Sequence, residues 1–343
     1  MQIKEDAHFL IIRRDNIGDL LCTTPLLRGL RQRFPGAWIG ALVNSYNAPV
    51  LAGNPDVDAI YSYDKLKHLP PGRSRAGALF ERARMILSLR RRRIDYAILA
   101  APGFQSSALR FARLAAPRHV VGYGAPGNEV DLCVAPDAAR RLHEAEACFR
   151  LLEPFGITGN PPPMALSADP AVAAALRALP GWQAVASGGG PLVGLHISAR
   201  KPPQRWPVER FAELAKRLHA SHGARFLLFW APGSADNALH PGDDDKAAAL
   251  TSELKKLPAL PVPTRSLPEL IAGLSLCDRV VCSDGGAMHI AAALGKPIVC
   301  FFGNSDAARW HPWGVPHVVL QKESRDVADV TVDEACAAFA RLD

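Results

Sequence analysis

The sequence predicts an α/β fold with two parallel-sheet halves, and three observations support this prediction. Short apolar runs rich in β-branched residues alternate with amphipathic helical segments along the whole chain. A Pro- and Gly-rich stretch near residues 155–165 interrupts the alternation, which then restarts. The length of 343 residues is enough for two domains of ordinary size. Each half is therefore expected to form a parallel sheet with helices on both faces.

The first half should contain five strands and four helices. Each expected strand is a short apolar run followed by turn residues, and each expected helix has apolar positions three or four residues apart. The strands are expected at Phe9–Ile12, Trp38–Val43, Ala59–Tyr63, Tyr96–Ala100 and His119–Gly122, and the helices at 18–34, 75–92, 105–115 and 143–156.

The same pattern resumes in the second half after another break, "LPGWQAVASGGGP". Strands are expected at 192–197, 225–230, 279–283, 298–302 and 317–320, and helices at 207–221, 243–256, 267–275, 286–294 and 331–341. The predicted domains are 1–160 and 161–343. Ligands of such sheets lie beyond the carboxyl ends of the strands, so two facing domains are expected to enclose one cleft.

The composition is that of a soluble globular protein, with 48% hydrophobic and 21% charged residues. No apolar run reaches the ~18 residues that span a bilayer, and the first residues lack the layout of a signal peptide. We therefore expect a cytoplasmic protein. The seven cysteines show no CxxC spacing and no pairing with histidine. They are expected to be reduced core residues, and no metal site is expected.

Basic residues are concentrated in the first half of the chain. Residues 1–150 contain 22 Lys and Arg against 14 Asp and Glu, and 19 of the 22 are Arg. Guanidinium groups suit bidentate recognition of phosphate and carboxylate. Two interpretations stay open: a solvated basic face, or an anionic partner that binds this half.

Three stretches at predicted strand-to-helix turns carry residues suited to a site. The first is "RRDNIGDLL", 13–21, where Asp15 and Asp19 lie between a strand and a helix. Free N–H groups and the helix dipole stabilise a carboxylate at that place. Gly18 lets the backbone turn tightly or lets a substrate approach. The residues alone leave a helix cap and a catalytic base equally open for Asp19.

The second stretch is "GLHISARKPPQRWPVERF", 194–211, a strand followed by a polar loop and a helix. So many donors at the carboxyl end of one strand suit a phosphate group. The side chains concerned are those of His196, Ser198, Arg200, Lys201, Gln204 and Arg205.

The third stretch is "VVCSDGGAMHIAAALGKP", 280–297, in which a strand ends at Asp284 and a helix of small residues follows. Gly285, Gly286 and Ala287 leave the backbone open to a pyrophosphate at the helix N-terminus. His289 lies on the first turn of that helix. We expect the nucleotide on the second half, the acceptor on the Arg-rich first half, and Asp19 between them.

The three stretches together resemble the motifs of a known family. "NIGDLLCTTPLLRGLRQRFPGAWI" at 16–39, "QRWPVERFAEL" at 204–214 and "SDGGAMHIAAALGKPIVCFFGNSD" at 283–306 occur in the family's order. The family is glycosyltransferase family 9, the ADP-heptose:lipopolysaccharide heptosyltransferases. The resemblance covers most of the chain. It implies a GT-B fold, with an N-terminal acceptor-binding domain and a C-terminal nucleotide-sugar-binding domain.

The resemblance also implies a reaction. ADP-heptose would donate L-glycero-D-manno-heptose to the inner core of lipopolysaccharide at the cytoplasmic face of the inner membrane. The transfer would be inverting and metal-independent, with no cofactor beyond the donor. Asp19 would act as the general base toward the acceptor hydroxyl. The basic first half fits peripheral, salt-sensitive association with an anionic membrane surface.

The resemblance further implies which residues contact each substrate. The donor phosphates would contact Ser198, Ala199 and the backbone of residues 285–287. Asp284 and His289 would lie on the heptose or phosphate side. His196, Arg200, Lys201 and Gln204 are expected beside the donor, and Arg13, Arg14 and Gly18 beside the acceptor.

The chain departs from the family pattern at several positions. A family Lys thought to hold the donor phosphates aligns with Gln204, and a frequent Ser or Thr is replaced by Gly285. The ribose-binding acid has only two candidates, Asp236 and Asp245, in a stretch that is longer than usual. These departures motivate an alternative, a family 9 enzyme that uses another nucleotide sugar or acceptor in surface polysaccharide synthesis.

Two other classes of protein fit less well. A nucleic-acid-binding protein would use the Arg-rich half, but the sequence shows no aromatic interleaving and no nucleic-acid-binding motif. A Rossmann-type oxidoreductase would carry GxGxxG after its first strand, and no such motif follows Phe9–Ile12.

Overall fold

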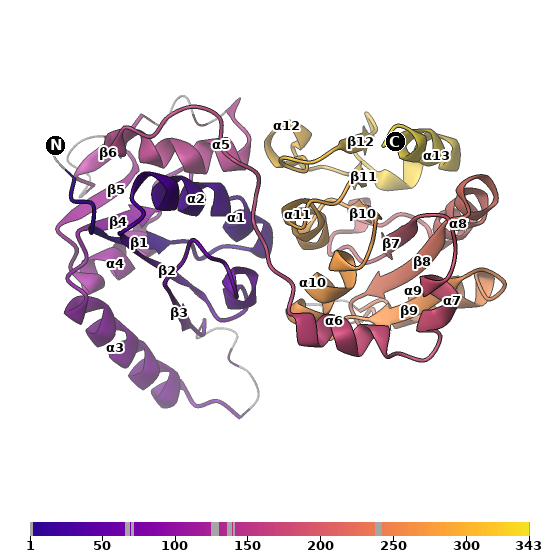
Figure 1. The fold of residues 1–343 in the computed structure, drawn as a ribbon, viewed down its shortest axis with the longest axis horizontal. Helices are drawn as coiled ribbons and strands as arrows, with labels where there is room; N and C mark the ends of the chain where they lie inside the picture. Colours follow the sequence, from indigo (N-terminus) through magenta and orange to yellow (C-terminus); the bar gives the residue numbers. More distant parts are fainter. Residues whose placement is uncertain are drawn as a thin grey trace. The chain divides into compact units, whose positions relative to one another are not determined.

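The structure, a computed structural model, describes residues 3–65, 69, 72–124, 130–135, 139, 141–236 and 242–342. The chain divides into two compact units, Met1–Leu166 and Ser167–Asp343. The division falls after residue 166, against a predicted boundary after residue 160. Each unit contains a sheet with helices on both sides (Figure 1).

The first sheet has six parallel strands in the order β3-β2-β1-β4-β5-β6. This is the strand order of Rossmann sheets, in which ligands bind where the order reverses, here between β1 and β4. The strands are β1 (His8–Ile12), β2 (Trp38–Asn44), β3 (Ala59–Tyr63), β4 (Tyr96–Leu99), β5 (His119–Tyr123) and β6 (Leu132–Val134).

Helices cover both faces of the first sheet because the buried strand residues alternate between two cores. Leu10 and Ile12 belong to a core that includes Phe111 of α4. On the other face the ring of Phe9 lies 5.5 Å from that of Phe34, which follows α2. The helices are α1 (Ile17–Leu21), α2 (Thr24–Arg33), α3 (Arg75–Arg91), α4 (Ser106–Ala115) and α5 (Glu144–Phe149), with 3-10 turns at Ala48–Leu51 and Arg150–Phe155.

The predicted helix 18–34 is two helices, which corrects the sequence interpretation. Helix α1 ends at Leu21, and α2 starts at Thr24 with Pro25 in its first turn. Proline has no N–H to donate and its ring clashes with the preceding turn of a continuous helix. The first turn of a new helix tolerates it, since the N–H groups there have no partner within the helix.

The second sheet also has six parallel strands, in the order β12-β11-β10-β7-β8-β9. Counted from β7, this path through the sheet is the same as that of the first unit. The strands are β7 (Leu192–His196), β8 (Arg225–Trp230), β9 (Ala259–Pro263), β10 (Arg279–Ser283), β11 (Ile298–Phe302) and β12 (His317–Gln321). The predicted α/β class with two Rossmann-like parallel sheets is confirmed.

The second sheet is also covered on both faces. One core joins Leu195 to Phe211 of α8 and Phe339 of α13. On the other face a side chain at Gly194 would approach Cys277 Sγ to 2.9 Å, so the glycine allows this close packing. The helices are α6 (Pro170–Arg177), α7 (Trp182–Ala186), α8 (Val208–His222), α9 (Asp244–Glu253), α10 (Leu267–Ser275), α11 (Gly286–Ala293), α12 (Ala307–Trp310) and α13 (Val332–Ala340), with 3-10 turns at Pro202–Gln204 and Val327–Asp329.

Among the described residues, no helix is both long enough and apolar enough to pass through a bilayer.

Candidate active site

Asp19 lies in the first turn of α1, at the carboxyl edge of the first sheet. Its Oδ2 accepts a 2.9 Å hydrogen bond from the backbone N–H of Asn16, and its Oδ1 accepts one of 2.6 Å from Arg13 Nη2. The side chain keeps 13% of its surface exposed. The carboxylate therefore caps the helix, pairs with a guanidinium and still remains open to a substrate.

Arg13 is almost completely buried, at 2% exposure, and its donors face protein groups. Nη2 also donates to Glu144 Oε1 at 2.7 Å, Nη1 donates to the carbonyl oxygen of Ala100, and Nε lies 3.3 Å from Asp15 Oδ2. Burial by itself lowers the pKa of Arg13, but the acidic groups around the guanidinium outweigh burial and raise the pKa. The guanidinium therefore stays charged and fixes the position of Asp19.

The three predicted acceptor-side residues lie in different environments. Arg13 is engaged by protein groups, which favours a role in positioning Asp19. Arg14 is half-buried, donates from Nε to the hydroxyl of Tyr63, and lies with its guanidinium carbon 4.8 Å from the ring centroid of Phe111. Gly18 is buried within α1. Contact of these residues with an acceptor stays a prediction.

The loop that carries these residues is held by side chains from neighbouring strand ends. Asn44 and Asn47 donate to the carbonyl oxygen of Asp15 at 3.1 and 2.7 Å, and Gln105 Nε2 donates to Asp15 Oδ2 at 3.0 Å. Sequence reasoning missed these partners and Glu144. They lie 29 to 131 residues from the groups they hold, and no local motif links them.

In the second unit, Gln204 joins two of the predicted stretches. Its Nε2 donates to Asp284 Oδ2 at 2.9 Å and to Ser305 Oγ at 3.2 Å, and the residue is 6% exposed. The loops after β7, β10 and β11 are thereby tied together at the carboxyl edge of the sheet. The buried amide of Gln204 thus holds the carboxylate of Asp284 in place.

In the rest of the loop after β7, hydrogen bonds hold the backbone in place, and two basic side chains are exposed. The backbone N–H of Ala231 donates to Ser198 Oγ, and Arg205 Nε donates to the carbonyl oxygen of Ala199, both at 2.9 Å. Arg200 and Lys201 are exposed. The loop is thus held in shape while two positive charges remain available to an anion.

His196 is not a positive group near neutral pH. Burial, and secondly the charge of Lys246, lower the pKa of His196 to about 4. Its buried Nδ1 has no hydrogen-bond partner among the described residues. Lys246 donates to the carbonyl oxygens of Ile197 and Trp206 at 2.9 and 2.8 Å, and burial lowers the pKa of Lys246 to about 8. Contact of neutral His196 with the donor stays a prediction.

The loop after β10 leaves its backbone uncovered. Gly285 has φ +156°, and a Cβ built there meets no atom within 4 Å, so the space beside it is open. Gly286 begins α11, and Ala287 is 5% exposed. His289 is 4% exposed, and its ring lies edge-on to that of Trp310 with centroids 5.9 Å apart, which favours a packing role. Contact of these four residues with a donor stays a prediction.

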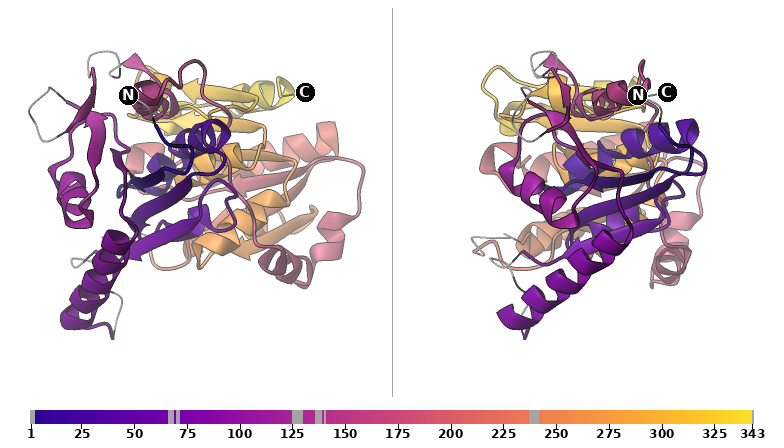
Figure 2. Two further views of the ribbon diagram at one scale, coloured as in Figure 1. Left: turned by 60° about the vertical axis from the view of Figure 1, so that its left-hand side comes forward. Right: turned by 90° about the vertical axis from the view of Figure 1, so that its left-hand side faces the viewer.

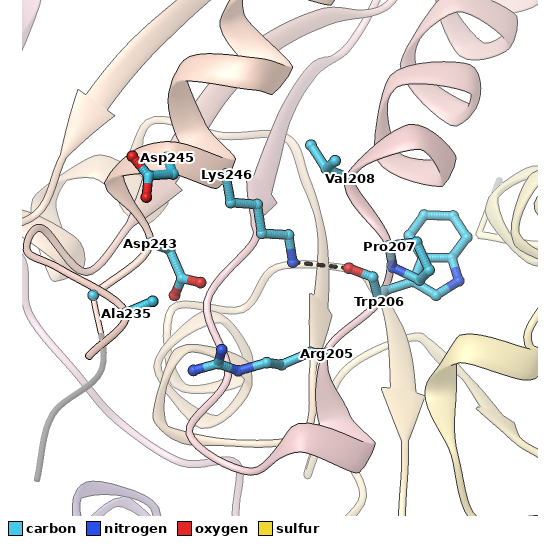
Figure 3. A pocket seen from close by; sticks show the side chains of 9 residues that line it. Arg205, Trp206, Pro207, Val208, Ala235, Asp243, Asp245 and Lys246 are labelled. Carbon is cyan, nitrogen blue, oxygen red and sulfur yellow. Dashed lines mark hydrogen bonds between the residues drawn. The ribbon is translucent and has the colours of Figure 1, made fainter. Parts of the chain in front are cut away.

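A cavity of about 350 Å³ lies in the second unit beside the loop after β7 (Figure 3). Asp243 is 6% exposed, and its Oδ2 has no hydrogen-bond partner among the described residues. Of the two candidate ribose-binding acids, Asp245 lines the cavity and Asp236 does not. The lining residues are Arg205, Trp206, Pro207, Val208, Ala235, Gly242, Asp243, Asp245 and Lys246.

Within the part of the chain that the structure describes, no group of three or more His, Cys, Asp or Glu side chains is placed to hold a metal ion.

Two Rossmann-like units of the same strand order, with polar loops at the strand ends of each, make up the GT-B fold, which the solved structure of E. coli ADP-heptose LPS heptosyltransferase II shares at a TM-score of 0.74. Residues 82–336 match the family described as Glycosyltransferase family 9 (heptosyltransferase). This match covers more than half of the chain, and the chain belongs to that family. The protein is therefore a glycosyltransferase.

A sequence relative supports the family assignment, and two solved structures share the fold. The chain is 28% identical to lipopolysaccharide heptosyltransferase 2 of Salmonella typhimurium, covering 86% of this chain and 82% of the relative. Among solved structures, a glycosyltransferase family 9 protein of Veillonella parvula has a TM-score of 0.79 at 18% identity, covering 99% and 98% of the two chains. The E. coli heptosyltransferase WaaC with ADP has a TM-score of 0.75 at 20% identity, covering 98% and 100%.

Proposed function

We propose that the protein transfers L-glycero-D-manno-heptose from ADP-heptose to the inner core of lipopolysaccharide. The observation that carries the proposal is the carboxylate of Asp19, which Arg13 and Asn16 hold at the carboxyl edge of the first sheet while part of it stays exposed. Support also comes from relatives named lipopolysaccharide heptosyltransferase and from a neighbouring structure that contains ADP-2-deoxy-2-fluoro heptose.

Asp19 is the general base in this proposal. Each carboxylate oxygen has two lone pairs, and each uses one of them to accept a hydrogen bond from Arg13 or Asn16. A further lone pair is left for the acceptor hydroxyl, whose proton moves to Asp19 as its oxygen attacks the anomeric carbon. The bond from that carbon to the ADP oxygen breaks on the opposite face. The product is therefore inverted, and no step requires a metal ion.

The donor is proposed to bind at the carboxyl edge of the second sheet. Arg200 and Lys201 would offset the charge of the diphosphate, and the free N–H groups at the start of α11 would donate hydrogen bonds to its oxygens. Asp284, held by Gln204, would accept hydrogen bonds from sugar hydroxyls. The carboxylates of Asp243 and Asp245 in the neighbouring cavity suit the hydroxyls of a ribose.

A second candidate function is transfer of a different sugar by the same chemistry. Gln204 supplies no charge toward a leaving ADP, and Gly285 supplies no hydroxyl. Transfer assays with ADP-heptose and ADP-glucose, on heptose-deficient core acceptors, decide between the two. We expect transfer from ADP-heptose only. Transfer from ADP-glucose with no transfer from ADP-heptose would favour the second candidate.

The acceptor in this proposal is carried by a lipid, so the protein has to work at a membrane surface. We propose a cytoplasmic protein that associates peripherally with the inner membrane. The excess of Arg in residues 1–150 supports attraction to an anionic surface, and such attraction weakens as salt screens it. Equal recovery with membranes at low and high salt would contradict this association.

A further inference from the structure

Helix α3 has apolar residues on two opposite sides. One side buries Ala78, Ile86 and Leu89 against the rest of the first unit. The other side carries Phe80 and Leu87, which are 65% and 53% exposed. These two residues are seven positions apart, about two turns, and so lie on the same side of the helix. A helix that is apolar on both sides is expected to have a partner on the second side as well.

The exposed apolar side chains of the protein are concentrated in one unit. All the large hydrophobic side chains that are exposed among the described residues belong to the first unit, and three of them are on α3. They are Tyr46, Ile60, Leu79, Phe80, Leu87, Phe104 and Leu114. Figures 1 and 2 show α3 at the margin of this unit, extending beyond β3. The outer side of α3 is therefore accessible to a macromolecule or a membrane surface.

Arginines accompany the exposed apolar residues along the same side of the helix. Arg84 and Arg91 each follow one of the exposed apolar residues by four positions, about one turn, and both are exposed. Among the described residues, no acidic side chain pairs with either. Glu81, the single acid of α3, is instead paired with Arg73 at 2.9 Å. The outer side thus combines apolar groups with unneutralised positive charge.

We propose that the outer side of α3 docks on an anionic lipid bilayer surface. Phe80 and Leu87 would enter the boundary between headgroups and acyl chains, while Arg84 and Arg91 contact lipid phosphates. A second copy of the chain fits less well, because it would bring the same arginines against each other. The inference deepens the proposed function and rests on its lipid-borne acceptor, which must be reached at such a surface.

Sedimentation of the full chain with vesicles tests the docking. Vesicles of phosphatidylcholine alone and with phosphatidylglycerol are compared for wild type, Phe80→Glu/Leu87→Glu and Arg84→Glu/Arg91→Glu. The matched control is Lys255→Glu/Lys256→Glu, the same charge change at two exposed residues of the second unit. We expect wild type and control to bind the anionic vesicles, and both α3 variants to bind at least about tenfold more weakly.

Two further measurements separate docking from chemistry. In Phe80→Trp, tryptophan emission should shift to shorter wavelength only with anionic vesicles. Transfer to a soluble, delipidated core oligosaccharide should be unchanged in the α3 variants. If wild type transfers nothing to that oligosaccharide yet binds vesicles through α3, the proposed function fails and the docking stands.

Three results would overturn the docking: no binding of wild type to anionic vesicles, equal losses in the α3 variants and the control, or loss of transfer to the soluble oligosaccharide in the α3 variants. A wild-type dimer that the α3 variants lose, without vesicle binding, would point to a second copy instead and also overturn it.

Discussion

One nitrogen of Arg13 serves two carboxylates: Nη2 donates to Asp19 at 2.6 Å and to Glu144 at 2.7 Å. Glu144 is 1% exposed, so the guanidinium is the charge that balances a buried acid as well as the one that orients Asp19. Arrangement of the proposed base and stability of the first unit therefore depend on the same side chain.

Removal of Arg13 should destabilise the protein strongly. Arg13→Met removes the cation that faces the carboxylates of Asp15, Asp19 and Glu144. Breaking a buried pair in this way costs about 3–5 kcal/mol of unfolding free energy. Arg217→Met, which removes an exposed pair with Asp333, should cost less than about 1 kcal/mol. Urea unfolding measures both. Equal losses would show that Arg13 has no special structural role.

A double variant separates stability from activity at the same cluster. Arg13→Met/Glu144→Leu removes both buried charges and should recover part of the stability lost in Arg13→Met. Transfer should remain low, because Asp19 still lacks the guanidinium that holds Oδ1. Recovery of transfer along with stability would mean that Arg13 does not position Asp19.

Gln204 should matter for donor binding more than for turnover. Gln204→Ala removes the donor that holds Asp284 and Ser305, leaving polar groups at the carboxyl edge without a partner. Such a loss is worth about 1–3 kcal/mol, so the KM for the nucleotide sugar should rise about tenfold or more with little change in kcat. Gln183→Ala, at an exposed position of α7, is the control. An unchanged KM in Gln204→Ala would refute the orienting role.

His196 should make stability depend on pH between about 4 and 6.5. Burial, then the charge of Lys246, lowers the pKa of His196 to about 4 in the folded protein. In the unfolded chain the imidazole takes up a proton near its ordinary pKa of about 6.5. The unfolded state therefore binds more protons in this range, and stability falls as pH falls from 6.5 to 4.

Comparison with His196→Asn isolates this contribution from that of the carboxylates. The free energy of unfolding of wild type, relative to the variant, should decrease by at most about 3 kcal/mol between pH 7 and pH 4. Urea unfolding at a series of pH values measures the difference. A difference that stays constant with pH would show that His196 is protonated normally in the folded state.

The sequence predicts the strands near the middle of each sheet better than those at the edges. Strand β9 was missed because Pro261 and Pro263 argue against a strand, yet β9 lies at the edge of its sheet, where proline is tolerated. Strand β6 was missed because Leu132–Val134 is too short to show alternation. Helix α6 lies between the expected linker and the break at 179–191, and α7 lies within that break. Pro170 is the first residue of α6, and Gly181 is the N-cap of α7.

The sequence predicts where candidate residues lie when they follow strand ends, and it does not predict the partners that hold them from distant parts of the chain. The position of Asp19 follows from a strand that turns into a helix, and Asp284 lies at a comparable turn in the second unit. Glu144 and Lys246 were not identified, because the local sequence pattern does not indicate which side chain from a distant part of the chain will be a hydrogen-bond partner. The contact of Gln204 with Asp284 likewise became evident only from the structure, in which Gln204 Nε2 lies 2.9 Å from Asp284 Oδ2.

The most direct test of the central claim is the transfer rate of Asp19→Asn with ADP-heptose and a heptose-deficient core acceptor. Asparagine keeps the size of the side chain but cannot take the hydroxyl proton, so kcat/KM should fall by about 10²-fold or more in folded protein. Asp15→Asn, a neighbouring acid that also faces Arg13, is the control and should lose far less. A loss of only a few fold in Asp19→Asn, or equal losses in the two variants, would contradict the assignment of Asp19 as the base.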